Sequence, residues 1–93
     1  MILKERRVIL FTGRVQGVGF RMTAVHLGED LALVGTVANR DHGQVELDVQ
    51  GDSQEIDTLV ERLREQFGTF VRSISQRTST PTGQPGQGIR VIH

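Results

Sequence analysis

Residues 34–50 of this chain, VGTVANRDHGQVELDVQ, decide its fold class. Residues 34–39 predict a strand, and residues 40–43 predict a turn in which Gly43 can adopt a positive φ. Residues 44–50 alternate strictly between apolar and polar side chains, which is the period of a half-buried strand. We therefore expect a β-hairpin whose second strand packs one set of side chains on a core and turns the other set to water. The core set is Val45, Leu47 and Val49, and the water-facing set is Glu46, Asp48 and Gln50.

The residues before the hairpin predict a strand, a loop and a helix. The apolar, β-branched run at residues 8–12 predicts a strand covered on both faces. Three glycines within residues 13–20 predict a loop with unusual backbone angles or a close approach to another group. Apolar residues three and four apart then predict a helix from Arg21 to about Leu33, with Gly28 packing closely on the sheet. The apolar face of this helix is expected to contain Ala24, Leu27, Gly28 and Leu31.

The residues after the hairpin predict a second helix and more strand. Asp52 or Ser53 can cap the helix at its start, and Gly68 can end it. Its apolar positions follow helical spacing and are Ile56, Leu59, Val60, Leu63 and Phe67. Beyond it we expect a strand over residues 70–75, a loop over residues 79–88 and a last strand over residues 89–92.

The predicted order is β-α-β-β-α-β with one extra, short C-terminal strand. Two right-handed β-α-β crossovers around a hairpin give a four-stranded antiparallel sheet with two helices on one face. The sequence therefore predicts an α+β fold, a ferredoxin-like sandwich, formed as a single domain over residues 1–93. This fold hosts many functions, so the fold alone assigns none.

Composition excludes several classes of function. Eleven Lys and Arg residues balance eleven Asp and Glu residues, so the bulk charge gives no strong attraction for nucleic acid or an anionic membrane. The absence of cysteine excludes disulfides, thiolate metal sites and a cysteine nucleophile. The three histidines, at positions 26, 42 and 93, lack the spacing of metal ligands, so we expect no metal and no cofactor.

The sequence carries no targeting signal that we can identify. The residues that follow Met1 lack the apolar core of a signal peptide, and no apolar run exceeds four residues. Such runs are too short for a transmembrane segment. We expect the protein to be cytoplasmic, and we expect a monomer.

The glycine-rich loop and the start of the following helix predict an anion site. Gly17 and Gly19 let successive backbone N–H groups point inward, and the helix N-terminus adds the positive end of its dipole. Arg21 adds a guanidinium fork that matches two phosphoryl oxygens. On its own this pattern is also compatible with a tight turn and a solvated arginine. It fits neither the Walker motif nor the dinucleotide fingerprint.

Two blocks of sequence resemble the motifs of the acylphosphatase family. Residues 13–21, GRVQGVGFR, resemble the family signature Gly-x-Val-Gln-Gly-Val-x-Phe-Arg. Residues 35–46, GTVANRDHGQVE, resemble the family's second motif, Gly-x-Val-x-Asn followed by Asp-Gly-x-Val-Glu. The resemblance covers nearly the whole chain and weakens after Gly68. Thr36 and Ala38 depart from the family pattern, which often has an aromatic residue and an arginine there, so we expect a different rim around the pocket.

The resemblance implies a hydrolase that cleaves the carboxyl–phosphate bond of small acyl phosphates. Arg21 would bind the phosphoryl group and Asn39 would orient the attacking water, although from residue type alone Asn39 is an ordinary strand-end residue. The loop would supply backbone N–H groups, and a phosphate or sulfate ion is expected there. Its residues are Gln16, Gly17, Val18, Gly19 and Phe20.

Two rival functions are compared with the enzyme, and the first of them stays open. Similar domains begin larger proteins that handle carbamoyl groups in hydrogenase maturation, so this chain could be a non-catalytic accessory domain that binds phosphate or carbamoyl phosphate. The chain's end at His93 favours a free-standing enzyme. Nucleic-acid-binding ferredoxin-like modules stack bases on exposed aromatic residues of the sheet. This chain has no Trp or Tyr and only four Phe, so we expect no nucleic-acid partner.

Overall fold

A computed structural model describes residues 4–83 and 86–92 of the chain. Its elements are β1 Glu5–Gly13, α1 Phe20–Leu27, β2 Val34–Asn39, η1 Asp41–Gly43, β3 Val45–Gly51, α2 Ser53–Phe67, η2 Gly68–Phe70, β4 Val71–Ser79 and β5 Gly88–Ile92. The predicted order of helices and strands is therefore confirmed. The expected loop over residues 79–88 includes two residues, 84 and 85, that lie outside the described part, as does His93.

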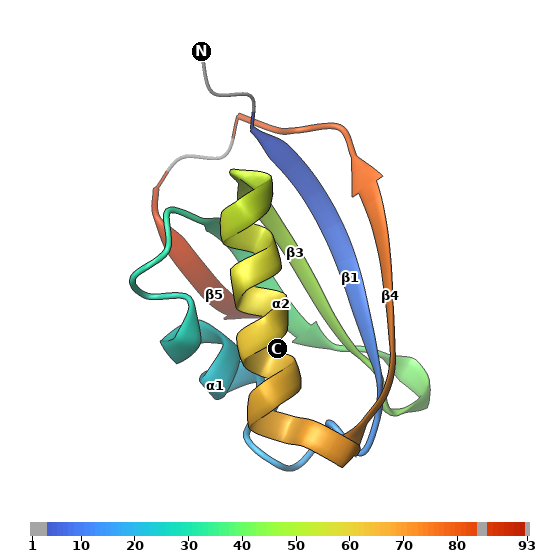
Figure 1. The fold of residues 1–93 in the computed structure, drawn as a ribbon. Helices are drawn as coiled ribbons and strands as arrows, with labels where there is room; N and C mark the ends of the chain where they lie inside the picture. Colours follow the sequence, from blue (N-terminus) through green and yellow to red (C-terminus); the bar gives the residue numbers. More distant parts are fainter. Residues whose placement is uncertain (1–3, 84–85, 93) are drawn as a thin grey trace.

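The five strands form one sheet in the order β4-β1-β3-β2-β5. The β1–β3, β1–β4 and β2–β3 pairs are antiparallel, as expected for the ferredoxin-like arrangement. The C-terminal strand β5 joins the edge of the sheet parallel to β2, with Val37 opposite Val91. The sheet is therefore mixed, and both helices lie on one of its faces (Figure 1).

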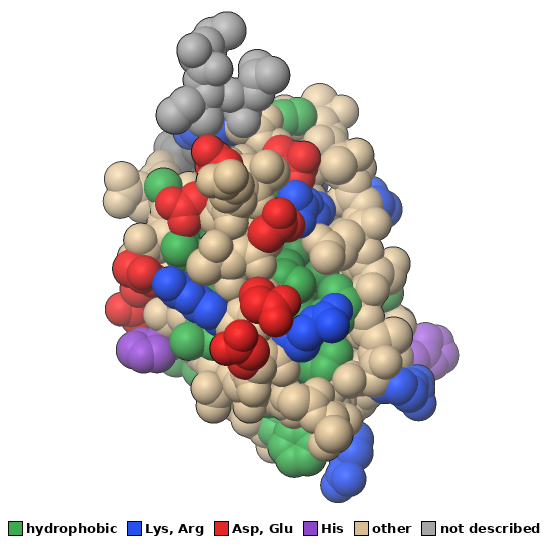
Figure 2. All heavy atoms as spheres, in the orientation of Figure 1, with side chains coloured by type: hydrophobic (Ala, Val, Ile, Leu, Met, Phe, Trp, Pro, Cys, Tyr) green, Lys and Arg blue, Asp and Glu red, His purple; other side chains and the backbone are tan. Residues whose placement is uncertain are grey.

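The core lies between this face of the sheet and the two helices. The alternation predicted for β3 is confirmed, because Val45, Leu47 and Val49 are fully buried. From α2, Ile56, Leu59, Val60 and Leu63 cover them. The caps of α2 are also as expected: the Asp52 carboxylate accepts from the Gln54 N–H at 2.9 Å, and Gly68 ends the helix with a φ of 51°. The outer side of α2 carries acidic and basic side chains interspersed (Figure 2).

The first helix is shorter than the sequence predicted. It ends at Leu27 and not near Leu33, because Gly28 caps it and packs against Ile89 of β5. A Cβ on residue 28 would lie 2.8 Å from the Ile89 Cδ1, so this glycine is the close packing point that we expected. Arg62 of α2 donates to the Leu27 carbonyl at 2.7 Å and satisfies a group at the end of the helix. The apolar spacing continues past the end of the helix because Leu31 is partly buried and still packs against the core.

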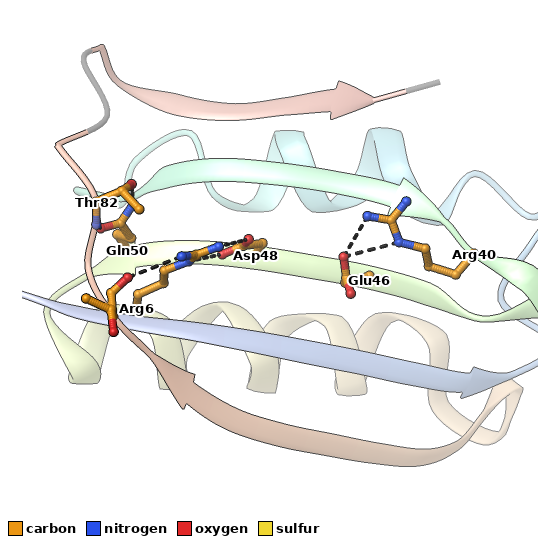
Figure 3. A network of polar contacts seen from close by, with 7 residues as sticks. Arg6, Arg40, Glu46, Asp48, Gln50 and Thr82 are labelled. Atoms are coloured by element: carbon orange, nitrogen blue, oxygen red, sulfur yellow. Dashed lines mark hydrogen bonds and ion pairs between the residues drawn. The ribbon is translucent and has the colours of Figure 1, made fainter.

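Two expectations about the sheet faces were wrong. The strand predicted over residues 8–12 lies within β1, and helices cover only one of its faces. On the open face Val8 is buried but Leu10 is only half-buried, so this face is not covered throughout. Gln50 does not face water; it is only 5% exposed, because its side chain is hydrogen-bonded to Thr82 in the segment after β4. Figure 3 shows this open face with Gln50 and Thr82 in contact at one end.

Ion pairs also cover the open face of the sheet. Arg6 of β1 binds Asp48 of β3 through two hydrogen bonds, of 3.0 and 2.8 Å, and Arg40 binds Glu46 at 2.7 Å (Figure 3). The hydrogen bond to Asp48 raises the pKa of Arg6. Acidic side chains of β3 that were expected only to be solvated therefore link neighbouring elements.

Candidate active site

A pocket of about 140 Å³ lies at the end of the sheet where β1 and β2 finish. The residues that line it are Val15, Gly17, Gly19, Phe20, Arg21, Met22, Asn39 and Val91. The structure thus brings Arg21 and Asn39, which lie 18 positions apart in the sequence, to one small cavity. Among its described lining residues, Arg21 is the only charged one.

Two buried side chains anchor the glycine-rich loop. Val15 at its start is fully buried, and Phe20 at its end is 2% exposed. The Phe20 ring packs between Phe11 and Phe67, with ring centroids 4.8 and 4.6 Å away. The residues between these anchors are exposed, so the loop is held at both ends and its backbone faces solvent.

Two glycines of the loop, Gly17 and Gly19, are required by conformation and not by space. Gly17 and Gly19 have φ angles of 77° and 78°, in the left-handed region, while a Cβ on either would meet nothing within 4 Å. Gly19 is also the N-cap of α1, and no side chain caps that helix end. The first N–H groups of α1 therefore have no side-chain acceptor, which suits a bound anion.

The two predicted catalytic residues come from the ends of different elements. Arg21 is the second residue of α1 and is half-buried. Asn39 is the last residue of β2, opposite Val45 of β3, and is exposed. The strand ends there because residues 40–44 form a turn in which His42 takes a left-handed φ of 64° and Gly43 one of 78°. The expectation of a positive φ at Gly43 is confirmed, and His42 shares it.

Not all of the predicted loop lines the pocket. Gly17, Gly19 and Phe20 do, whereas Gln16 and Val18 do not. The Gln16 side chain is hydrogen-bonded to the turn after β2. Thr36 and Ala38 also lie outside the lining, and Ala38 is 3% exposed within the sheet. The different rim expected from these two departures stays a prediction.

Sequence reasoning missed three lining residues, Val15, Met22 and Val91. Val15 lies within the first motif and Met22 directly follows it, so their closeness to Arg21 in the sequence could have predicted that they line the pocket. Val91 lies far along the chain on β5, and its position depends on the parallel pairing with β2. No local pattern indicates that pairing.

Within residues 4–83 and 86–92, His, Asp and Glu side chains form no group of three or more that could hold a metal ion. None of the helices in the described part of the chain has the length and apolar character needed to cross a membrane.

The family model described as Acylphosphatase matches residues 7–87. The chain belongs to the acylphosphatase family. An acylphosphatase from Chlorobaculum tepidum is 41% identical over 63 residues, which are 67% of this chain and 68% of that protein. The crystal structure of acylphosphatase from Bacillus subtilis matches with a TM-score of 0.80 and 30% identity, covering 98% of this chain and 100% of that one. The resemblance of the two motifs to the acylphosphatase signature is thus confirmed, and these relatives support an acylphosphatase activity for this enzyme.

The same acylphosphatase-like fold also occurs inside a much longer chain. The crystal structure of T. kodakarensis HypF matches 94% of this chain with a TM-score of 0.77 and 26% identity, but only 12% of that protein. A fold that forms a small part of a longer protein is what the accessory-domain alternative requires.

Proposed function

We propose that the chain hydrolyses the carboxyl–phosphate bond of small acyl phosphates at this pocket. The observation that carries the proposal is that Arg21 and Asn39 line one small pocket at the uncapped start of α1. A cation, a helix N-terminus and a neutral amide around one cavity suit a phosphoryl group and a water molecule.

The loop and Arg21 would hold the phosphoryl group. Backbone N–H groups around Gly17 and Gly19 would donate to its oxygens, together with the first N–H groups of α1. The Arg21 guanidinium would bind two of these oxygens and stabilise the charge that they carry in the transition state. Because Val15 and Phe20 are buried, these donors are positioned before the substrate arrives.

Asn39 would place the attacking water in line with the leaving oxygen. The water oxygen forms a bond to phosphorus while the bond to the acyl oxygen breaks, and the carboxylate leaves with the electron pair. A carboxylate is a good leaving group, so no strong general acid is required. Since the described lining residues include no Asp, Glu or His, a phosphoryl oxygen of the substrate would take the proton of the water. Catalysis would then rest on position and charge stabilisation.

The test is hydrolysis of benzoyl phosphate at neutral pH, with a chelator present, by wild type and by Arg21→Ala and Asn39→Ala. We expect wild type to turn over and each variant to lose about 100-fold or more in kcat/KM. Arg14→Ala is the matched control, because Arg14 comes from the same loop but lies over the Phe70 ring, 5.7 Å from its centroid, and outside the pocket lining. Thermal unfolding should show that all variants are folded. Full activity in Arg21→Ala would contradict the proposal.

The alternative is an accessory domain that binds phosphate or carbamoyl phosphate without hydrolysis. This alternative is supported by the presence of the same fold within the longer HypF chain. It predicts that inorganic phosphate binds to wild type, and more weakly to Arg21→Ala, while benzoyl phosphate stays intact.

A further inference from the structure

Gln16 is the one residue between the two anchors of the loop whose side chain is seen bound to another segment. Its Nε2 donates to the Arg40 carbonyl at 2.8 Å and to the Gln44 carbonyl at 2.8 Å. Both protons of the amide group are thus used. The Arg40 N–H in turn donates to the Gln44 carbonyl at 2.7 Å, so Gln16 binds the two residues that close the turn.

This contact spans a gap that the sheet leaves open. β1, which leads into the loop, and β2, which ends at Asn39, are not neighbours, because β3 lies between them. Both strands run antiparallel to β3, so they finish at the same end of the sheet. Ladder hydrogen bonds therefore do not set the position of the loop relative to Asn39 directly. Gln16 does so across β3, by binding the residue that follows Asn39.

Because Gln16 Nε2 donates to two carbonyl oxygens, those of Arg40 and Gln44, the contact is selective for an amide side chain. One NH₂ group can donate to two carbonyl oxygens at once. An ionised glutamate has no proton to donate and would repel both oxygens, whereas a methionine of similar length would leave both without this donor. Gln16 lies outside the pocket lining, so its loss would leave the groups that face the phosphoryl oxygens in place.

We propose that Gln16 is a positioning residue that sets the separation between the phosphoryl-binding loop and Asn39. The inference rests on the proposed function and deepens it. Gln16 acts on the alignment of the water with the bound phosphoryl group, and not on the binding of that group. Misplacement of a reacting group by about 1 Å can cost about 100-fold in rate. Removal of this clamp should therefore lower kcat and leave the affinity for phosphate almost unchanged.

The experiment compares Gln16→Met and Gln16→Glu with wild type. Its readouts are kcat and KM for benzoyl phosphate, the inhibition constant of inorganic phosphate, and thermal unfolding. We expect kcat to fall by about 10- to 100-fold in both variants, while the inhibition constant of phosphate changes by less than about threefold in Gln16→Met. Because Gln16 is exposed, both variants should fold.

Gln44→Met is the matched control. It removes the hydrogen bond of 3.1 Å from the Gln44 side chain to the Thr12 hydroxyl, on the same hairpin, but keeps the Gln44 carbonyl that Gln16 binds. Its kcat should stay within about threefold of wild type.

Three results would overturn the proposal. If kcat of both Gln16 variants stays near wild type, the clamp does not position the site. If kcat and phosphate affinity fall together in Gln16→Met, the residue only maintains the structure of the loop. If wild type itself is inactive, the proposed function fails and this inference with it, so the failure of each can be told apart.

Discussion

Gly35 of β2 lies so close to Asp48 of β3 that a Cβ on residue 35 would stand 2.0 Å from the Asp48 carbonyl oxygen. Gly35 is the first residue of the second motif. This close approach explains why the motif needs a glycine there, because any side chain would clash with β3. Gly35→Ala should force the two strands apart and lower the free energy of unfolding by about 1–3 kcal/mol. This loss can be measured by urea unfolding, with circular dichroism as the probe. Gly83→Ala is the control, because its Cβ meets nothing within 4 Å, and equal loss in both variants would contradict this explanation.

The buried Gln50 side chain depends on Thr82. Its Nε2 donates to the Thr82 hydroxyl at 2.7 Å, and its Oε1 accepts from the Thr82 N–H at 2.7 Å. Thr82→Val keeps the shape of the side chain but leaves the Gln50 donor without its acceptor, at a cost of about 1–3 kcal/mol in the free energy of unfolding. Thr80→Val is the control, because Thr80 is exposed. It should change the free energy of unfolding by less than about 0.5 kcal/mol. Equal values for the two variants in urea unfolding would show that the Gln50–Thr82 pair adds nothing.

The ion pair between Asp30 and Arg62 should make stability depend on acid pH. Arg62 donates to Asp30 at 2.7 Å, and this hydrogen bond lowers the pKa of Asp30. The folded-state pKa lies below the unfolded value, so the contribution is complete above about pH 4 and is lost as pH falls through the folded pKa. We expect Asp30→Asn to unfold at a lower temperature than wild type at pH 7. The difference should shrink below about pH 4, and in high salt. A difference that persists at the lowest pH would mean that Asp30 acts through something other than its charge.

A charge introduced at position 22 should affect substrate binding, because Met22 lines the pocket beside Arg21 and is 66% exposed. If the pocket binds a phosphoryl group, Met22→Glu should raise KM for benzoyl phosphate by about three- to tenfold through repulsion. Met22→Gln, of similar length but neutral, should stay within about twofold. Added salt should narrow the gap between these two variants. A gap that does not depend on salt would point to shape in place of charge.

Local pattern was sufficient for much of the fold. The two-residue period of β3, the three- and four-residue spacing in α2 and the caps at Asp52 and Gly68 each depend on residues close together in the chain, and all are confirmed. The motif blocks predicted the family for the same reason, because each is a short continuous stretch. Val15, Phe20 and the loop glycines carry their structural roles within nine residues.

Contacts between distant segments decided the rest. Helix α1 ends at Leu27 because Ile89 packs against Gly28 and Arg62 binds the Leu27 carbonyl, and neither partner is visible in the helix's own sequence. The parallel pairing of β5 brings Val91 to the pocket, and Gln16 reaches the turn after β2 across an intervening strand. The sequence by itself thus determined the order of the elements, the family and the candidate residues Arg21 and Asn39. Only the tertiary structure decided which side chains surround them, because hydrogen bonds and packing between segments far apart in the chain follow no local period.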